Sequence, residues 1–310
     1  MKYGDKVSVV TLCYKNYDYL YDTIDSVLSQ NYPNIEYIIS DDGCDSFPLE
    51  DIEKYIKFHN KGNIKKYIIR KNENNIGTVK HENVVCSMIH GEYTIQLSCG
   101  DSFYENNSVT KIIKRISKSN EDILLFSRLV CDKEGNGLYY LPHIGDIKRI
   151  KNMNNRRQYE ALVSGYFWDM ASGSAAAYRT EFLKRFGFDE RYKLIEDYPL
   201  FTKYSWLNKL SCQYDIVSIR YRLGGVSNTT NPIIRKDMEL YNSKDRIQHI
   251  NCLSLFTKEK IRYQLNRDNR KFKVSMFFRY PHVLLWLLSY KVRQKLEISI
   301  EKRSLHNSGV

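Results

Sequence analysis

The sequence lacks the patterns that would mark a metal-stapled, repetitive or disordered protein. Its seven cysteines stand at positions 13, 44, 86, 99, 131, 212 and 252, with no CxxC pair and no zinc-finger spacing. Dispersed cysteines, together with the lack of an apolar signal segment at residues 1–5, predict reduced thiols in a cytoplasm and argue against a structural zinc site. The chain also shows no internal repeat and no low-complexity tract.

No apolar run is long enough to span a membrane. The longest uncharged run in the tail, residues 280–290, contains Pro281 and His282, and a spanning helix needs about 20 apolar residues. The stretch 277–296 nevertheless combines aromatic residues, leucines and flanking cations, which is the composition of a helix lying on an anionic membrane surface. A basic helix packed on the domain would look the same, so both interpretations stay open.

The positive charge of the chain is concentrated near its end. The 48 Lys and Arg residues outnumber the 36 Asp and Glu residues by 12, and half of this excess lies in residues 271–310. A nucleic-acid-binding surface would not usually concentrate charge in this way, so we expect no nucleic-acid partner. The 25 tyrosines and 13 phenylalanines instead predict a packed protein with a sizeable core.

Short apolar runs and amphipathic segments alternate from residue 6 to about residue 127. Four apolar runs predict buried strands: residues 6–13, 35–43, 65–71 and 92–98. Three intervening segments predict helices: residues 17–30, 49–60 and 77–91, the last closed by Gly91. This alternation predicts a parallel α/β sheet with right-handed crossovers.

The alternation stops after residue 130. There we expect a turn at residues 132–137, a helix at 155–165, a small-residue loop from Trp168 into a helix ending at Gly187, a helix at 196–209 and a strand at 214–223. From about residue 235 onward the pattern is helical and basic.

Polar residues stand at the carboxyl ends of the predicted strands, where parallel sheets bind ligands. They are Thr11, Asp41, Asp42 and Asp101. Asp41 and Asp42, in SDDGCDS, could hold the base or ribose of a nucleotide, or could serve only an Asx-type turn. Asp101 ends LSCGD, whose small residues would leave room for a diphosphate and a divalent ion held by carboxylate oxygen. A strand-terminating turn is the alternative.

Three further segments carry candidate residues. Gly77 precedes a predicted helix whose N-terminus favours anions, and Lys80 could reach a phosphate from its first turn. Glu196 and Asp197, in IEDYPLF, could take a proton from an attacking hydroxyl, or could merely complement a helix dipole. Arg222, in YRLGGVSN, could contact phosphate or could belong to a surface hairpin.

Together these segments resemble the GT-A-fold glycosyltransferases of the large inverting family 2, especially those that build capsular or cell-surface polysaccharides. The resemblance covers about residues 6–230 and rests on five motifs in order: VSVVTLCYKNYDYLYDTIDSVLSQNYPNIEYIISDDGCDS, NIGTVKHEN, GEYTIQLSCGD, FGFDERYKLIEDYPLF and YRLGGVSN. It implies a Rossmann-like, mixed and mainly parallel sheet flanked by helices. Residues 1–230 would form the glycosyltransferase domain, with a donor half at 1–127 and an acceptor half at 128–230, and residues 231–310 a basic helical extension.

The resemblance also implies a site. Eight residues would bind the donor: Thr11, Tyr14, Asp41, Asp42, Lys80, Gly100, Asp101 and Arg222. Asp197 would be the catalytic base, with Glu196 beside it. Three residues would shape the acceptor side: Trp168, Ser172 and Gly173. Asp101 would hold Mn²⁺ or Mg²⁺, although Ser98 and Gly100 stand at common acid positions of the metal motif.

The reaction implied by the resemblance is inverting transfer of a hexosyl or hexosaminyl group. The expected donor is a UDP-sugar and the expected acceptor a hydroxyl of a growing, lipid-linked glycan. The basic tail would then hold a cytoplasmic enzyme at the inner face of the plasma membrane. Three alternatives stay open: a metal-independent transferase that uses another nucleotide sugar, a nucleic-acid-binding protein, and a non-catalytic nucleotide-sugar-binding subunit. Whether the chain forms a homo-oligomer is also open.

Overall fold

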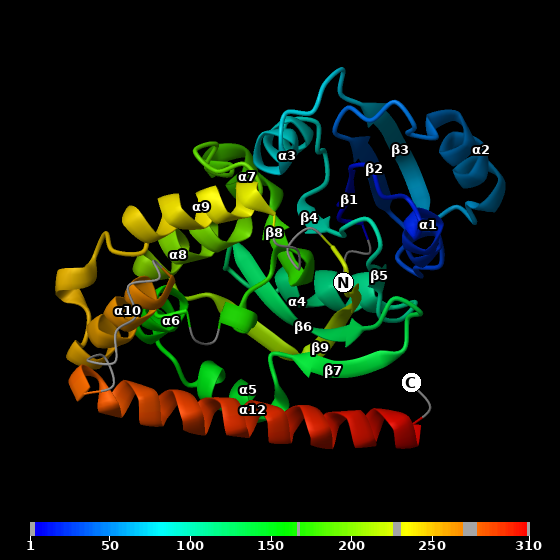
Figure 1. Ribbon diagram of the computed structural model, residues 1–310. Coiled ribbons are helices and arrows are strands. Elements are labelled where there is room, and N and C mark those ends of the chain that lie inside the picture. Colours follow the sequence, from blue (N-terminus) through cyan, green and yellow to red (C-terminus); the bar gives the residue numbers. More distant parts are fainter. Residues whose placement is uncertain (1–3, 166–167, 226–230, 269–277, 309–310) are drawn as a thin grey trace.

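A nine-stranded mixed sheet forms the centre of the molecule, with helices on both faces (Figure 1). The computed structural model describes residues 4–165, 168–225, 231–268 and 278–308. Within them the strand order is β3-β2-β1-β4-β8-β6-β9-β5, and β7 pairs with the outer part of β6. The mixed sheet with flanking helices that the sequence predicts is therefore confirmed.

The first half of the sheet is parallel, as the alternating pattern predicts. Its strands are β1 (Val7–Cys13), β2 (Ile35–Asp41), β3 (Ile64–Lys71) and β4 (Tyr93–Gln96). The helices between them are α1 (Leu20–Leu28), α2 (Leu49–His59) and α3 (Thr78–Cys86). Because neighbouring side chains of a strand point to opposite faces, Val9 packs in the core with α1 and α2, whereas Val10 packs in the core with α3.

Helix α3 ends at Cys86, short of the predicted end at Gly91. Gly91 instead approaches β1 closely, and its N–H donates to the Ser8 hydroxyl at 2.9 Å. A Cβ atom at this position would lie 2.5 Å from the Ser8 nitrogen. The glycine is required by this close contact, not by the end of a helix.

The second half of the sheet is mixed. Its strands are β5 (Ser102–Phe103), β6 (Ile123–Cys131), β7 (Gly137–Leu141), β8 (Ala176–Arg179) and β9 (Ser211–Arg222). The predicted turn at 132–137 joins β6 to β7. The prediction of an uninterrupted loop before the helix at 180 is wrong, because β8 lies between β4 and β6 and pairs antiparallel with both.

Helices fill the space around this second half. They are α4 (Ser108–Ile116), α5 (Ile144–Lys151), α6 (Asn155–Val163), α7 (Thr180–Phe186) and α8 (Asp197–Leu207). Two short 3-10 turns, η1 (Trp168–Met170) and η2 (Gly173–Ala175), precede β8. The sequence pattern predicts α6, α7 and α8 but neither α4 nor α5.

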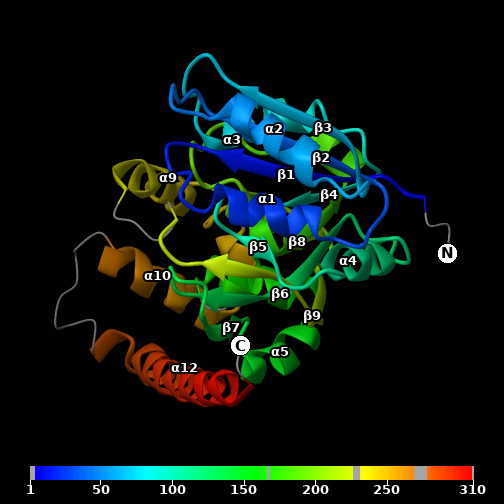
Figure 2. The same cartoon turned by 90° about the vertical axis from the view of Figure 1, so that its right-hand side faces the viewer.

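The C-terminal region is helical, as expected, and contains α9 (Pro232–Ser243), α10 (Leu255–Asp268) and α12 (Pro281–Ser308). Helix α9 packs into the core through Tyr241, and Asp237 accepts the backbone N–H groups of residues 193–195. Helix α12 lies along one edge of the molecule, beside α5 and β7 (Figures 1 and 2). Among the described residues, none of the helices has the length and hydrophobicity needed to cross a membrane.

Candidate active site

The turn after β4 is held open by hydrogen bonds to α1. The Gly100 N–H donates to the Thr23 hydroxyl at 3.0 Å, and this hydroxyl donates to the Asp101 carbonyl at 2.7 Å. Gly100 has a φ of +100°, and a Cβ atom there would meet nothing within 4 Å. The hydrogen bonds to Thr23 therefore fix the backbone of the SCGD turn, and the described residues leave room beside Gly100.

One carboxylate oxygen of Asp101 is buried without a partner among the described residues. Asp101 is only 3% exposed. Oδ1 accepts the backbone N–H of Arg222 at 2.9 Å, and no described group donates to Oδ2. Burial raises the pKa of this carboxyl to about 7, against the lowering effect of the Arg222 N–H and of nearby arginines. A buried carboxylate oxygen without a hydrogen-bond partner lowers the stability of the folded protein, unless a bound ligand interacts with it.

The chemistry of this oxygen fits a divalent cation, although the protein offers a single carboxylate for it. No three His, Cys, Asp or Glu side chains converge on a metal-binding geometry in the part of the chain that the structure describes. A hard cation on Asp101 would take its remaining oxygen ligands from a diphosphate and water, as Mg²⁺ commonly does.

The guanidinium of Arg222 points away from Asp101. It forms an ion pair with Asp22 at 2.9 Å, donates to the Lys133 carbonyl at 3.2 Å and lies over the ring of Tyr19 at 3.8 Å. The motifs LSCGD and YRLGGVSN are thus in contact through the backbone N–H of Arg222 in β9, not through its side chain. Direct binding of phosphate by the Arg222 side chain stays a prediction.

Arg128, which the sequence analysis does not single out, provides a buried positive charge at the site. It lies on β6 and is 7% exposed, and its guanidinium donates to the Asp169 carbonyl at 3.2 Å. Burial raises the pKa values of Asp101, Asp169 and Asp197, and the charge of Arg128 opposes that rise in all three. The sequence feature that could have indicated Arg128 is its position within an otherwise mostly apolar segment, ILLFSRLVC, which forms the fully buried strand β6.

Asp197 begins α8 and is held by the predicted acceptor loop. The Gly173 N–H donates to Asp197 Oδ2 at 2.8 Å. A Cβ atom on Gly173 would lie 3.2 Å from the Asp197 Cβ, so a side chain there would crowd the carboxylate. Ser172 hydrogen-bonds to Ser174 in the same loop. The side chain of Trp168 lies outside the described residues.

Three carboxylates gather around this helix start. Burial raises the pKa of Asp197, and burial together with the charge of Asp197 raises the pKa of Glu196 to about 8. Glu82 on α3 is buried, and none of the residues that the structure describes donates to its Oε2. Its pKa is raised well above the usual range by burial and by these two acids. Sequence spacing gives no hint that residue 82 faces residues 196 and 197.

Asp41 and Asp42 organise the protein's own loops. Asp41 accepts the Tyr17 hydroxyl and the Cys44 N–H, both at 2.6 Å. Asp42 accepts four donors, from Asn72, Asn75, Ile76 and Gly77. The contact of Asp41 with the Cys44 N–H is a turn within SDDGCDS, whereas the donors to Asp42 come from residues 72–77, beside the start of α3. Nucleotide binding by either acid stays a prediction.

The remaining candidates occupy different environments. Thr11 is buried in β1 and hydrogen-bonds to the Tyr37 hydroxyl at 3.2 Å. Tyr14 is exposed just beyond the end of β1, and Lys80 is exposed in the first turn of α3. Their roles in donor binding stay predictions.

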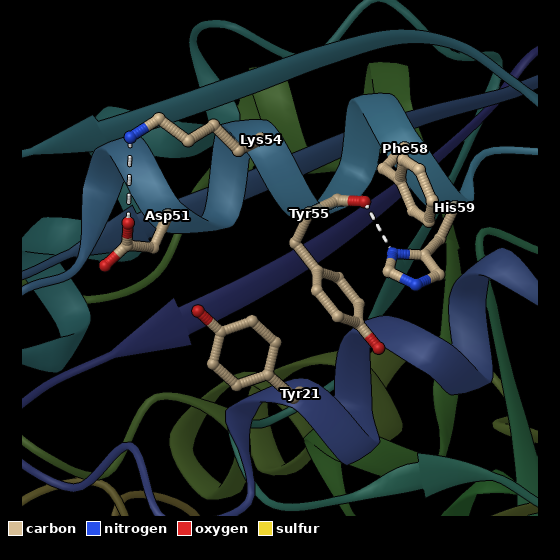
Figure 3. Close-up of a pocket in the computed structure, with 6 residues that line it drawn as sticks. All are labelled: Tyr21, Asp51, Lys54, Tyr55, Phe58 and His59. Carbon is tan, nitrogen blue, oxygen red and sulfur yellow. Dashed lines mark hydrogen bonds and ion pairs between the residues drawn. The ribbon is translucent and has the colours of Figure 1, made fainter.

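A separate pocket of about 560 Å³ opens between α1 and α2 (Figure 3). It is lined by Tyr21, Asp51, Lys54, Tyr55, Phe58 and His59. Its aromatic residues contact one another. The rings of Tyr21 and Tyr55 pack edge to face with centroids 4.8 Å apart, and the backbone carbonyl of Tyr55 hydrogen-bonds to the His59 ring. None of the candidate residues whose side chains the structure describes lines this pocket.

Comparison with known proteins gives consistent matches. A family model described as "Glycosyl transferase family 2" matches residues 8–187, more than half of the chain. An uncharacterized glycosyltransferase of Haemophilus influenzae is 23% identical, over 88% of this chain and 85% of its own. A processive diacylglycerol beta-glycosyltransferase of Mycoplasma genitalium is 22% identical, over 97% of this chain and 89% of its own.

Among solved structures, S. aureus TarS 1-349 in complex with UDP-GlcNAc superimposes with a TM-score of 0.59 and 20% identity, covering 88% of this chain and 75% of that one. Of a longer TarS chain, this chain covers 45%. The likeness supports the GT-A-like fold that the motifs predict.

Proposed function

The chain belongs to glycosyl transferase family 2, and we propose that it transfers a sugar, with inversion, from a UDP-sugar to a hydroxyl of a growing surface glycan. The observation that carries this proposal is the joining of distant motifs at one edge of the sheet. Asp101 and β9 meet there, and Asp197 is oriented by Gly173. The TarS complex with UDP-GlcNAc supports the choice of donor, and the processive diacylglycerol beta-glycosyltransferase supports an acceptor with a lipid part.

In this proposal Asp197 is the general base. Its Oδ2 is fixed by the Gly173 N–H, and burial raises its pKa toward a value suited to accepting a proton. The acceptor hydroxyl gives its proton to Asp197 while its oxygen attacks the anomeric carbon. The bond to the diphosphate breaks on the opposite face, so a single displacement inverts that carbon and requires no nucleophile from the protein.

The departing diphosphate needs positive charge. A divalent cation held by Asp101 would neutralise the negative charge that develops as the bond breaks. Arg128 contributes a fixed charge close to the same acid. Because Asp101 is the single carboxylate at this position and Arg128 is buried beside it, a metal-independent transferase is the second candidate.

Calorimetric titration with UDP, GDP, CMP and dTDP, each with and without Mn²⁺, tests the donor. We expect UDP to bind most tightly and to require the metal. Equal binding without metal would favour the metal-independent transferase, and preference for another nucleotide would change the donor. Binding without turnover on any acceptor, with Asp197→Asn unchanged, would favour a non-catalytic subunit. No binding of any nucleotide would contradict the proposal.

Replacing Arg128 with glutamine should lower kcat/KM roughly 10²-fold and weaken UDP binding, because the leaving group loses a fixed charge in a site shielded from water. Glutamine keeps a polar side chain without the charge, and the backbone pairing of β6 does not depend on the side chain of residue 128. Arg128→Lys keeps the positive charge, so its kcat/KM and UDP affinity should fall less than those of Arg128→Gln. Steady-state kinetics and UDP titration measure both effects.

Arg115→Gln is the matched control, since Arg115 pairs with Asp215 near the surface, where both side chains are exposed. It should leave kcat/KM unchanged. A folded Arg128→Gln protein with undiminished UDP affinity would remove Arg128 from the site. Thermal melts accompany the kinetics, because three buried acids lose a neighbouring cation in this variant.

A further inference from the structure

Helix α12 presents a continuous apolar stripe to solvent. Five aliphatic side chains are 58–68% exposed: Leu285, Leu288, Val292, Leu296 and Ile300. They follow one another at intervals of three or four residues, so they lie on one side of the helix. The helix runs along an edge of the molecule in both views, so this side is open to an external surface (Figures 1 and 2).

The acids of the same helix face the protein. Glu301 is 3% exposed, accepts the backbone N–H groups of Tyr140 and Ile144, and pairs with His143. Glu297 pairs with Arg293, whose guanidinium also reaches Asp146 at 2.6 Å. A surface helix normally buries aliphatic residues and exposes charged ones. The inner face of α12 combines these polar contacts with the buried Val283 and Leu305. Much aliphatic surface still remains outside, which marks an interaction surface.

The charges exposed on α12 are positive. Lys291, Lys295 and Lys302 are exposed at intervals of four and seven residues, so they form a line beside the stripe, and Arg303 is exposed next to them. Both glutamates of the helix are turned inward. An aliphatic stripe bordered by lysines is the pattern of a helix that lies in a membrane interface.

We propose that this face of α12 binds the surface of an anionic lipid bilayer, with the stripe in the headgroup boundary and the lysines on the headgroups. A second copy of the chain fits less well. Two such faces would bring like charges together, without exposed acids on either helix to pair with them. Anionic headgroups supply the complementary charge. None of the stripe residues is a candidate residue of the site of sugar transfer.

Co-sedimentation with vesicles tests the proposal on the full chain. We expect binding to phosphatidylcholine vesicles that contain phosphatidylglycerol and much weaker binding to phosphatidylcholine alone. Lys291→Gln/Lys295→Gln/Lys302→Gln should lose roughly 10²-fold of its partitioning, because three charges leave the lipid surface. Leu288→Ser/Val292→Ser should lose at least about tenfold, because two aliphatic groups leave the headgroup boundary.

Point variants are preferable to removing α12, because Val283 and Leu305 on its inner face belong to the packed interior. Matched controls carry the same changes elsewhere. Phe186→Ser/Leu207→Ser removes two exposed apolar side chains from α7 and α8, and Lys54→Gln/Lys57→Gln/Lys65→Gln removes three exposed lysines from the region of α2 and β3. Both control proteins should partition like the parent.

Sedimentation velocity on the same proteins separates the outcomes. If the parent does not bind anionic vesicles, or if the α12 variants bind as well as the parent, the proposal is wrong. A dimer that disappears in Leu288→Ser/Val292→Ser, with no vesicle binding, would assign the stripe to a second copy. The vesicle assay requires neither donor nor turnover, so its result is independent of the proposed reaction.

Discussion

Asp197→Asn should lower kcat about 10²- to 10⁴-fold, the range that a positioned general base contributes, while UDP affinity stays close to that of the parent. Asparagine has the same shape, and its amide oxygen can still accept the Gly173 N–H that orients Asp197. It cannot take a proton from the acceptor hydroxyl. Single-turnover kinetics, with UDP titration on the same preparation, would separate the loss of chemistry from any loss of binding.

The pH dependence of the parent enzyme provides a second check on Asp197. A base must be ionised to act, so kcat/KM should rise with pH through the pKa of Asp197. Burial raises that pKa, so the rise should lie above the ordinary aspartate range near 4. Glu196→Gln is the matched control, since the pKa of Glu196 is raised to about 8 and an amide resembles its neutral form. If Glu196→Gln abolishes transfer and Asp197→Asn does not, the base is Glu196.

Asp101→Asn should weaken UDP binding in the presence of Mn²⁺ roughly 10²-fold or more, because the free carboxylate oxygen is the protein's expected ligand for the cation. The same substitution should remove most of the difference between titrations with and without metal. Asp45→Asn is the matched control, since Asp45 is fully exposed and pairs weakly with Lys71 at 3.6 Å. Unchanged metal-dependent binding by Asp101→Asn would contradict the assignment.

The same variant should be more stable than the parent at pH 8 when no ligand is bound. Burial raises the pKa of Asp101 from 3.8 to about 7, so below pH 4 the acid is neutral in both the folded and the unfolded chain. As pH rises from 4 to 7 the unfolded chain ionises first, and the folded protein loses stability. The upper bound of this loss is about 4 kcal/mol.

Urea denaturation of ligand-free protein at pH 5 and pH 8 measures this effect. The gain in unfolding free energy of Asp101→Asn over the parent should be larger at pH 8 than at pH 5. A variant that is less stable than the parent at pH 8 would show that Asp101 is ionised without strain in the folded protein. In that case Asp101→Asn would lower both UDP affinity and stability, whereas we expect it to lower UDP affinity and raise the stability of the ligand-free protein.

The first half of the fold could be predicted because its signals are local. Each strand contains a short apolar run, β2 and β4 are followed by acids and glycines, and each connecting helix has its own periodicity. Strand β8 could not be predicted in this way. Its four residues include two alanines with little strand preference, and it forms because β4 and β6 offer hydrogen bonds on both sides.

Residues of the candidate site could be predicted only where they lie together in one sequence motif. The small residues before Asp101 and the acid pair at 196 and 197 are visible in the sequence. Arg128 and Glu82 become site residues through sheet register and helix packing, which bring them beside acids far away in the chain. The four donors to Asp42 come from residues 72–77, and no sequence pattern pairs this acid with that loop.

The contact between Asp237 and the backbone of residues 193–195 has a consequence for the order of events during synthesis. This carboxylate fixes the segment that leads directly into the two acids at the start of α8. The four parallel strands of the first hundred residues pair with one another, so their register does not depend on α9. The segment before the proposed base acquires its anchor only after α9 has left the exit tunnel. The acid cluster at the start of α8 is therefore the part of the candidate site whose support is synthesised last.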